Sequence, residues 1–300
     1  MSGVITTSSF AKSLWPGVNT WYGQAYAEYP VEWDKLFEKN TSRRAFEEDV
    51  GTSGLGLAVV KDQAGSITYD SMRQGFTSRY NHVTYGLGFI VTREAFDDDL
   101  YDVVAKKKAQ ALAFSMRQTK EIIGANVYNR AFNTSYLGGD GATLIACGAG
   151  GSASAPNVTG GTYTNGPSAA VDLSEAALEQ ACIDIAGFTN DRGLKIAVRP
   201  RKLIIPKELM FEADRILKTE GRTGTDLNDL NALKARGLIP EVVVNHYLTD
   251  TSNDAWFILT DVRDGLKYFE RRADEFTMDE DFDTENAKYK ATARYSFGWT

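Results

Sequence analysis

One stretch of the sequence, TREAFDDDLYDVVAKKKAQALAFSMRQTKEIIGANVYNRAF at residues 92–132, sets the scale of the molecule. Its apolar side chains recur every three to four residues, which predicts one long α-helix. Thr92 is the predicted N-cap, and the acidic residues at 94 and 97–99 suit the positive end of the helix dipole. At about 1.5 Å per residue the helix would be on the order of 55–60 Å long. That length predicts an elongated molecule with a spine. The apolar positions that carry the pattern are Leu100, Val103, Val104, Ala111, Leu112, Met116, Ile122, Ile123 and Val127.

An aromatic-rich segment lies at the N-terminal end of the chain. Residues 1–45 hold three of the five tryptophans among small polar residues, and their periodicity is weak. Only residues 32–39 read as two turns of helix. We therefore predict an N-terminal arm that must bury its rings on something else. The sequence leaves two hosts open, the core of the same chain and a neighbouring subunit.

The segment between this arm and the long helix predicts β-structure. Strands are expected at 57–60 and 67–69 around a hairpin turn at 62–65, followed by strand-like stretches at 76–85 and 85–91. The segment is polar and rich in glycine, and it offers few apolar side chains to a parent core. It therefore predicts a hairpin that projects from the body.

The chain after the long helix changes character twice. Residues 138–171 contain 9 of the 27 glycines and predict a long loop with some β-pairing. From Asp172 onward helices and strands alternate, with Ser174 or Asp172 as the first cap. The predicted helices are 173–185 and 207–218, a turn is expected at 190–193, and the predicted strands are 195–198, 202–205, 241–245, 255–259, 265–269 and 287–299.

Composition bounds the classes of protein to which the chain can belong. The 300 residues are 43% hydrophobic, which excludes disorder of the whole chain. The net charge of −7 excludes a basic nucleic-acid-binding surface spread over the chain. Two cysteines exclude a disulfide framework. The N-terminus lacks the pattern of a signal peptide, and no window approaches a membrane-spanning length, so we expect a reducing cytosol.

Motifs for catalysis and cofactor binding are missing from the sequence. It contains no Walker A or Rossmann glycine pattern, no G-x-S-x-G and no H-E-x-x-H, so we expect no cofactor. His82 and His246 are expected to be ordinary polar or packing residues, and Cys182 has the helical spacing of a core thiol. The acidic run at 279–285 fails as a calcium loop, because position six is Thr284 and position twelve is Lys290.

Five stretches in order resemble the major capsid proteins of tailed bacteriophages, the HK97-fold family, in the branch close to the Mu-like head subunits. Each stretch alone is modest, but the ordered set with fitting gaps spans about residues 40–298. The stretches are TREAFDDDLY at 92–101, DLSEAAL at 172–178 leading to IAVRPRKLIIP at 196–206, TDLNDLN at 225–231, YLTD at 247–250 with DAWFIL at 254–259, and RYSFGW at 294–299.

The resemblance implies an α+β fold of the HK97 type with four parts. These are an N-terminal arm at 1–45, an extended hairpin loop at 46–88, a peripheral domain at 89–171 and 273–300 that contains the spine helix, and an axial domain at 172–272. It implies a head subunit that assembles as pentamers and hexamers into an icosahedral shell around double-stranded DNA. Portal, scaffolding and decoration proteins are the implied partners. The chain would be assembled in the host bacterial cytoplasm and reside in the virion, with no membrane involved.

The same resemblance implies where subunits touch. The arm would strap a neighbour, the hairpin would lie over the adjacent subunit, and the loop at 219–232 would face the centre of the capsomer. Lys61 is the only lysine on the hairpin, and no partner for a covalent crosslink can be assigned. The predicted inter-subunit contacts are Trp15, Trp21, Tyr26, Lys61, Tyr69, Arg73, Arg79, Arg222, Asp226 and Asn228.

Two other readings stay open at this stage. One is an encapsulin-like shell that encloses cargo enzymes, which shares the fold. The other is a soluble carboxylate-dependent enzyme, whose missing feature is any convergent His, Cys or glycine-rich site.

Overall fold

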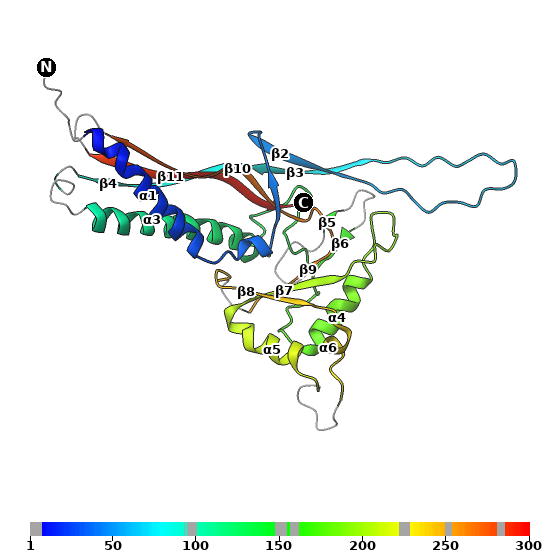
Figure 1. Cartoon of the computed structure of the whole chain (residues 1–300). Coiled ribbons are helices and arrows are strands. Elements are labelled where there is room, and N and C mark those ends of the chain that lie inside the picture. Colours follow the sequence, from blue (N-terminus) through cyan, green and yellow to red (C-terminus); the bar gives the residue numbers. More distant parts are fainter. Residues whose placement is uncertain are drawn as a thin grey trace, which may run out of the picture.

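The computed structural model describes residues 8–92, 94, 101–147, 155–156, 162–221, 229–249, 254–280 and 286–300 (Figure 1). Helices and strands form two lobes, and a long loop projects from one side of the molecule. No helix in these ranges is long and apolar enough to cross a membrane. We call the four-stranded sheet with its two long helices the first lobe, and the three-stranded sheet with its shorter helices the second lobe.

The sheet of the first lobe joins strands from opposite ends of the chain. Its order is β1 (Glu38–Thr41), β10 (Leu266–Glu280), β11 (Ala287–Trp299) and β4 (Val83–Val91). β1 runs parallel to β10, and the other neighbours are antiparallel. The predicted final strand at 287–299 is confirmed. Its alternate residues are buried and form one face of the sheet, namely Tyr289, Ala291, Ala293 and Tyr295.

Two long helices cover that face of the sheet. α1 (Ser8–Glu28) lies along α3 (Tyr101–Asn129), and both pack beneath the strands (Figure 1). Alanines at 105, 109 and 113 are fully buried on α3, and side chains this small let neighbouring backbones approach closely. The 29 residues of α3 span about 43 Å, so the predicted spine is present. The predicted N-cap at Thr92 precedes residues 93 and 95–100, which lie outside the described residues.

The N-terminal segment differs from its prediction. Instead of a weakly periodic arm, residues 8–28 form α1, which buries Val18, Tyr22 and Ala25 at helical spacing in the core of its own chain. Partly buried Trp21 and Tyr26 flank this stripe, so the aromatic residues do not follow a single helical spacing. The two turns of helix expected at 32–39 are also wrong. A short 3-10 turn, Trp33–Lys35, leads directly into β1, because the buried Glu121 carboxylate accepts hydrogen bonds from the Glu32 and Trp33 amides.

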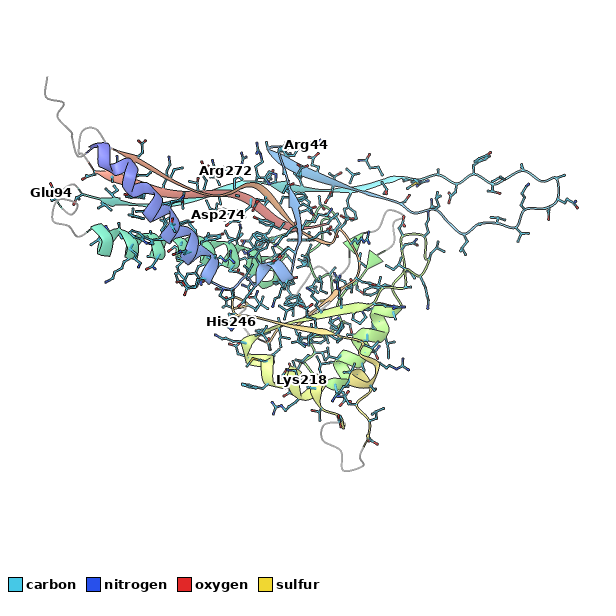
Figure 2. The ribbon with its side chains drawn as sticks, in the orientation of Figure 1. Arg44, Glu94, Lys218, His246, Arg272 and Asp274 are labelled. Carbon is cyan, nitrogen blue, oxygen red and sulfur yellow. The ribbon has the colours of Figure 1, made fainter. Side chains whose placement is uncertain are left out.

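A buried ion pair joins these helices to the sheet. The ammonium of Lys120 on α3 lies 3.3 Å from the carboxylate of Asp274 on β10, and their side chains are 6% and 14% exposed. The Tyr26 hydroxyl donates to the same carboxylate oxygen at 2.5 Å. Burial, then the Asp274 charge, raises the pKa of Tyr26. Figure 2 shows Asp274 within the first lobe. The ammonium also faces three aromatic rings at 5.1–5.4 Å, those of Trp33, Tyr268 and Tyr295.

A hairpin outside the four-stranded sheet carries the projecting loop. β2 (Phe46–Thr52) pairs with β3 (Gln74–Asn81), and the intervening residues 53–73, all of which are described, belong to no strand. The strands expected at 57–60 and 67–69 are therefore wrong, although the turn at 62–65 is present, with the Gly65 amide donating to the Asp62 carbonyl at 3.0 Å. These residues form no strand ladder, because they project beyond the sheet and beyond both lobes (Figure 1).

His82 marks the junction between β3 and β4. The ring is buried, and its two nitrogens lie 3.0 Å from the Ser296 hydroxyl and 3.1 Å from the Ser42 hydroxyl. It therefore ties β3 to β11 and to the segment after β1. Burial, followed by the positive charge of Arg294, holds the pKa of His82 below its ordinary value.

The second lobe is largely as predicted. Its sheet has the order β8 (Glu241–Asn245), β7 (Pro200–Pro206), β9 (Phe257–Thr260). Ser174 caps the first helix by accepting from the Ala177 amide, as expected for one of the two candidate caps. The strand expected at 195–198 is wrong, because only Lys195 forms a bridge and the strand begins at Pro200. The helices that flank this sheet are α4 (Glu175–Ala186), α5 (Met210–Lys218) and α6 (Ala232–Arg236).

The glycine-rich connection contains a short β-pair, as expected. β5 (Ala155–Pro156) pairs with β6 (Thr162–Tyr163), and residues 148–154 and 157–161 lie outside the described residues.

The ion pair predicts a large cost when one partner is removed. Asp274→Ala leaves the Lys120 ammonium buried without a carboxylate and should lower the free energy of unfolding by about 3–5 kcal/mol. The matched double variant, Lys120→Met with Asp274→Leu, should regain most of that loss. Urea unfolding of the subunit at low concentration measures both. Equal losses in the single and double variants would contradict the role given to the pair.

His82 predicts that stability falls in acid. Its unfolded pKa is about 6.5 and its folded pKa is lower, so the unfolded chain binds the proton first. The contribution is complete above about pH 6.5 and is lost as the pH falls through the folded pKa. His82→Gln should therefore reduce the change in melting temperature between about pH 7.5 and about pH 5. Ser78→Ala, which removes a buried hydroxyl of the adjoining strand that does not titrate, is the control; equal effects of the two variants would refute the assignment.

Candidate assembly surfaces

The projecting loop presents apolar side chains to solvent. Val60 and Tyr69 are 90% and 92% exposed, and other large apolar residues on both limbs are more than half exposed. Figure 1 shows the loop reaching away from both lobes. Soluble monomers rarely expose apolar surface this continuous, so such a surface usually marks an interaction site. The exposed large apolar residues of the loop are Leu55, Leu57, Val59, Val60, Ile67, Tyr69 and Met72.

The order of residues gives the loop an apolar edge. In an extended chain alternate side chains point to the same side, so Leu55, Leu57 and Val59 share one edge of the first limb. Small residues, Gly56 and Ala58, lie between them. A continuous apolar edge of this kind can pack on another apolar surface. Polar residues along the edge would interrupt that packing.

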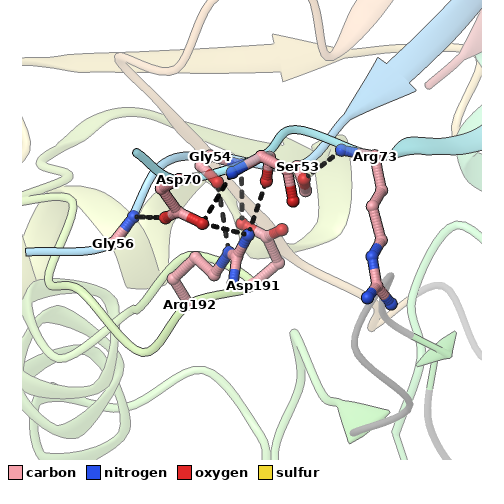
Figure 3. Close-up of polar contacts among 8 residues, drawn as sticks. Ser53, Gly54, Gly56, Asp70, Arg73, Asp191 and Arg192 are labelled. Carbon is pink, nitrogen blue, oxygen red and sulfur yellow. Dashed lines mark hydrogen bonds and ion pairs between the residues drawn. The ribbon is translucent and has the colours of Figure 1, made fainter. Parts of the chain in front are cut away.

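The base of the loop is held by polar contacts (Figure 3). The Ser53 amide donates to the Arg73 carbonyl at 2.8 Å, and the Arg73 amide donates to the Ser53 hydroxyl at 2.7 Å. Further out, the Gly56 amide donates to the Asp70 carboxylate at 2.9 Å. That amide and the Ser71 amide, which also donates to the carboxylate, hold the pKa of Asp70 below its ordinary value. The two limbs are thus joined near the body and separate beyond it.

A turn of the second lobe reaches the same place. Arg192 lies in the turn predicted at 190–193, and its guanidinium donates to the Gly54 carbonyl at 3.2 Å and to the Ser71 carbonyl at 2.9 Å. It also lies 3.5 Å from the Asp70 carboxylate. The neighbouring Asp191 accepts from the Gly54 amide at 3.2 Å. The sequence indicated the turn but carried no sign of this contact, because the partners lie about 120–140 residues away.

Four of the ten predicted contact residues lie on the hairpin and its loop. Lys61 and Tyr69 are exposed on the projecting part. Arg73 is exposed at the base, and Figure 3 shows its side chain apart from the Arg192 cluster. Arg79 lies on β3, where its guanidinium sits 3.7 Å from the Phe46 ring and 3.7 Å from the Glu48 carboxylate. Of these four, Lys61 and Tyr69 lie furthest from the body.

The N-terminal contact residues lie on α1. Trp21 packs partly buried against the first-lobe core, with the Lys106 ammonium 5.9 Å from its ring. Tyr26 has its partners in its own chain, Asp274 and the guanidinium of Arg117, which lies 4.9 Å from the ring. Trp15 belongs to the same helix. Of the two hosts considered for this segment, the described part of α1 uses its own core.

The remaining predicted residues, Arg222, Asp226 and Asn228, lie outside the described residues. The second lobe nevertheless carries exposed apolar side chains that the sequence did not single out. Phe211 on α5 is 69% exposed and borders a shallow hollow with Asp214 and Lys218. Ile183 on α4 is also exposed. Both lie off the buried stripes of their helices, which are formed by Leu178, Cys182 and Ile185 on α4 and by Ala213 and Ile216 on α5.

The described residues contain little that would support catalysis. They include no group of three or more His, Cys, Asp or Glu side chains placed to hold a metal ion. Cys147 and Cys182 are both buried thiols, and burial raises the pKa of Cys182. His246 lies 2.6 Å from the Glu32 carboxylate, in a pair that links the two lobes.

Two solved structures illustrate what the chain is similar to. A solved capsid of bacteriophage JBD30 is similar, with 12% identity over 74% of this chain and 92% of that chain and a TM-score of 0.55. A virus-like particle from Pyrococcus furiosus has 10% identity over 95% of this chain and 94% of that chain, with a TM-score of 0.49. No curated protein sequence matches. The expected α+β fold of HK97-like capsid proteins is confirmed.

A family model described as "Phage capsid protein" matches residues 75–300. The match includes the long helix, the second lobe and the final strand, so it rests on the same elements that build both lobes. The chain therefore belongs to the phage capsid protein family, and it is a structural protein of the virion that forms the shell of the phage head.

Proposed function

We propose that this chain is the major head subunit and assembles as pentamers and hexamers of itself into an icosahedral shell around double-stranded DNA. The single observation that carries the proposal is the projecting loop, whose exposed apolar side chains have no host in their own subunit. A closed shell supplies such a host for every copy, because each subunit both donates a loop and receives one.

The size of the loop suits this role. A standard protein interface buries about 800 Å² per partner, and seven large apolar side chains on an extended loop can supply a large part of that area. Each buried apolar Å² contributes roughly 25 cal/mol, so the contacts are individually modest and add up over the lattice. Modest contacts also let a wrongly placed subunit leave during assembly.

The division into arm, hairpin loop, peripheral domain and axial domain is part of the proposal. Two hydrophobic clusters support it. One contains α1, α3 and the four-stranded sheet and extends to Ile204, Val243 and Phe257 of the second sheet, and the other lies between that sheet and α4, α5 and α6. Within this division α1 packs on α3, so Val18, Tyr22 and Ala25 of the proposed arm have their core partners in the same chain.

The partners follow from the same proposal. Portal, scaffolding and decoration proteins are expected around a head subunit of the Mu-like branch, and the enclosed DNA is expected to be held without sequence-specific contacts. The net charge of −7 supports this, because an acidic wall repels phosphates and leaves the genome mobile during packaging. The proposed contacts between copies include Lys61 and Tyr69 on the loop, and Arg222, Asp226 and Asn228 near the capsomer centre.

The loop edge can be tested without altering the fold. Leu55→Ser, Leu57→Ser and Val59→Ser together should abolish stable shells, because they remove the apolar edge from the proposed interface. The unassembled subunit should keep its melting temperature, since these side chains contact no core. Leu57→Val with Val59→Leu is the matched control and should assemble. Negative-stain imaging and light scattering measure the outcome, and normal shells from the triple serine variant would refute the role of this edge.

The oligomeric state tests the proposal as a whole. The purified protein should elute from a size-exclusion column as pentamers, hexamers or shells, and electron microscopy should show rings or closed particles. A protein that stays monomeric at all concentrations and turns over a substrate would exclude the proposal and return the soluble enzyme as the better interpretation.

A further inference from the structure

A single arginine of the second lobe bridges both limbs of the projecting loop. The Arg192 guanidinium donates to the Gly54 carbonyl on the outgoing limb and to the Ser71 carbonyl on the returning limb, at 3.2 and 2.9 Å. Its charge also faces the Asp70 carboxylate at 3.5 Å. Figure 3 shows these groups converging on one guanidinium. Only arginine offers several donors in a fixed planar fork, so the bridge depends on this residue type.

The turn that presents Arg192 is itself well ordered by hydrogen bonds. The Asn190 side chain accepts from the amides of Arg192 and Leu194, at 3.0 and 2.8 Å. Gly193 closes the turn by donating to the Asn190 carbonyl at 2.9 Å, and its φ of +78° favours glycine. Asp191 adds a second contact by accepting from the Gly54 amide. The turn is therefore preformed, and it does not have to become ordered when it contacts the loop.

The loop acts mechanically as a lever. Each limb extends about ten residues beyond the base, or roughly 30 Å at about 3.3 Å per residue. A rotation of about 10° at the base would move the tip by about 5 Å, which is more than an apolar interface tolerates. Beyond Gly56 and Asp70 the described limbs share no strand ladder, so the direction of the loop is set at its base.

We propose that Arg192 is a positioning residue, and that the turn 190–193 latches the base of the loop and fixes the direction in which its apolar edge meets a second copy of this chain. The inference rests on the proposed function, which supplies the second copy. The latch also connects the second lobe to assembly. A movement of this lobe would shift the base of the loop through the Arg192 side chain. Its contacts are hydrogen bonds and a partly exposed ion pair, so the latch can open and close.

The latch can be measured in the subunit before assembly. Arg192→Ala should raise hydrogen exchange of the amides at 54–56 and 70–73 by on the order of tenfold, which corresponds to the loss of one or two net hydrogen bonds. Arg192→Lys keeps the charge but cannot bridge both carbonyls, and it should give an intermediate increase. Arg201→Ala removes an exposed arginine from β7 of the same lobe and should leave exchange in the loop unchanged. Melting temperatures check that each variant folds. If Arg192→Ala does not fold, Asp191→Asn gives a milder test of the same turn.

Assembly then separates the latch from the proposed function. Arg192→Ala should form shells several-fold more slowly than the natural chain, whereas the triple serine variant of the loop edge should fail to assemble while its exchange at the base stays normal. Unchanged exchange in Arg192→Ala would overturn the latch, and raised exchange with a normal assembly rate would overturn its positioning role. Failure of the natural chain to form shells would overturn the proposed function, while the exchange measurement would still report on the latch.

Discussion

The buried pair of Lys120 and Asp274 is the contact on which the first lobe depends. It joins the spine helix to the longest strand, and the Tyr26 hydroxyl brings α1 to the same carboxylate. Three aromatic rings enclose the ammonium and contribute a favourable face for the charge. A buried charge is costly unless it is paired and hydrogen-bonded, so these elements can pack only in the arrangement that satisfies both partners.

A rigid first lobe gives the projecting loop a firm origin. β3 carries the chain from the loop into the sheet, and buried His82 fixes the place where β3 gives way to β4. The loop leaves from the other end of that hairpin, where Arg192 of the second lobe meets it. Both lobes thus contact the base of the loop, and Arg192 joins the second lobe to it.

Regular patterns in the sequence predicted much of the fold. The spine helix, the final strand and most of the second lobe follow from periodicity and caps, which are local properties. The helical stripe of α1 was missed because Trp21 and Tyr26 lie beside buried Tyr22 and are partly buried themselves, which blurs the helical spacing. Strands were wrongly expected at 57–60 and 67–69 because β-branched and aromatic residues favour extended backbone whether or not a partner strand is present. The hydrogen bonds of Arg192 with the loop could not be predicted, since they join residues that are distant in the sequence and their acceptors are backbone carbonyls.

The scarcity of charge on the projecting loop has a thermal consequence. Between Leu55 and Tyr69 only Lys61 and Asp62 are charged, so contacts made by this loop depend on the release of water from apolar surface. That driving force is largely entropic near room temperature and weakens on cooling, whereas moderate ionic strength acts mainly by screening charges. A shell held together in this way is tightened by warmth and loosened by cold, and its strength depends little on ionic strength.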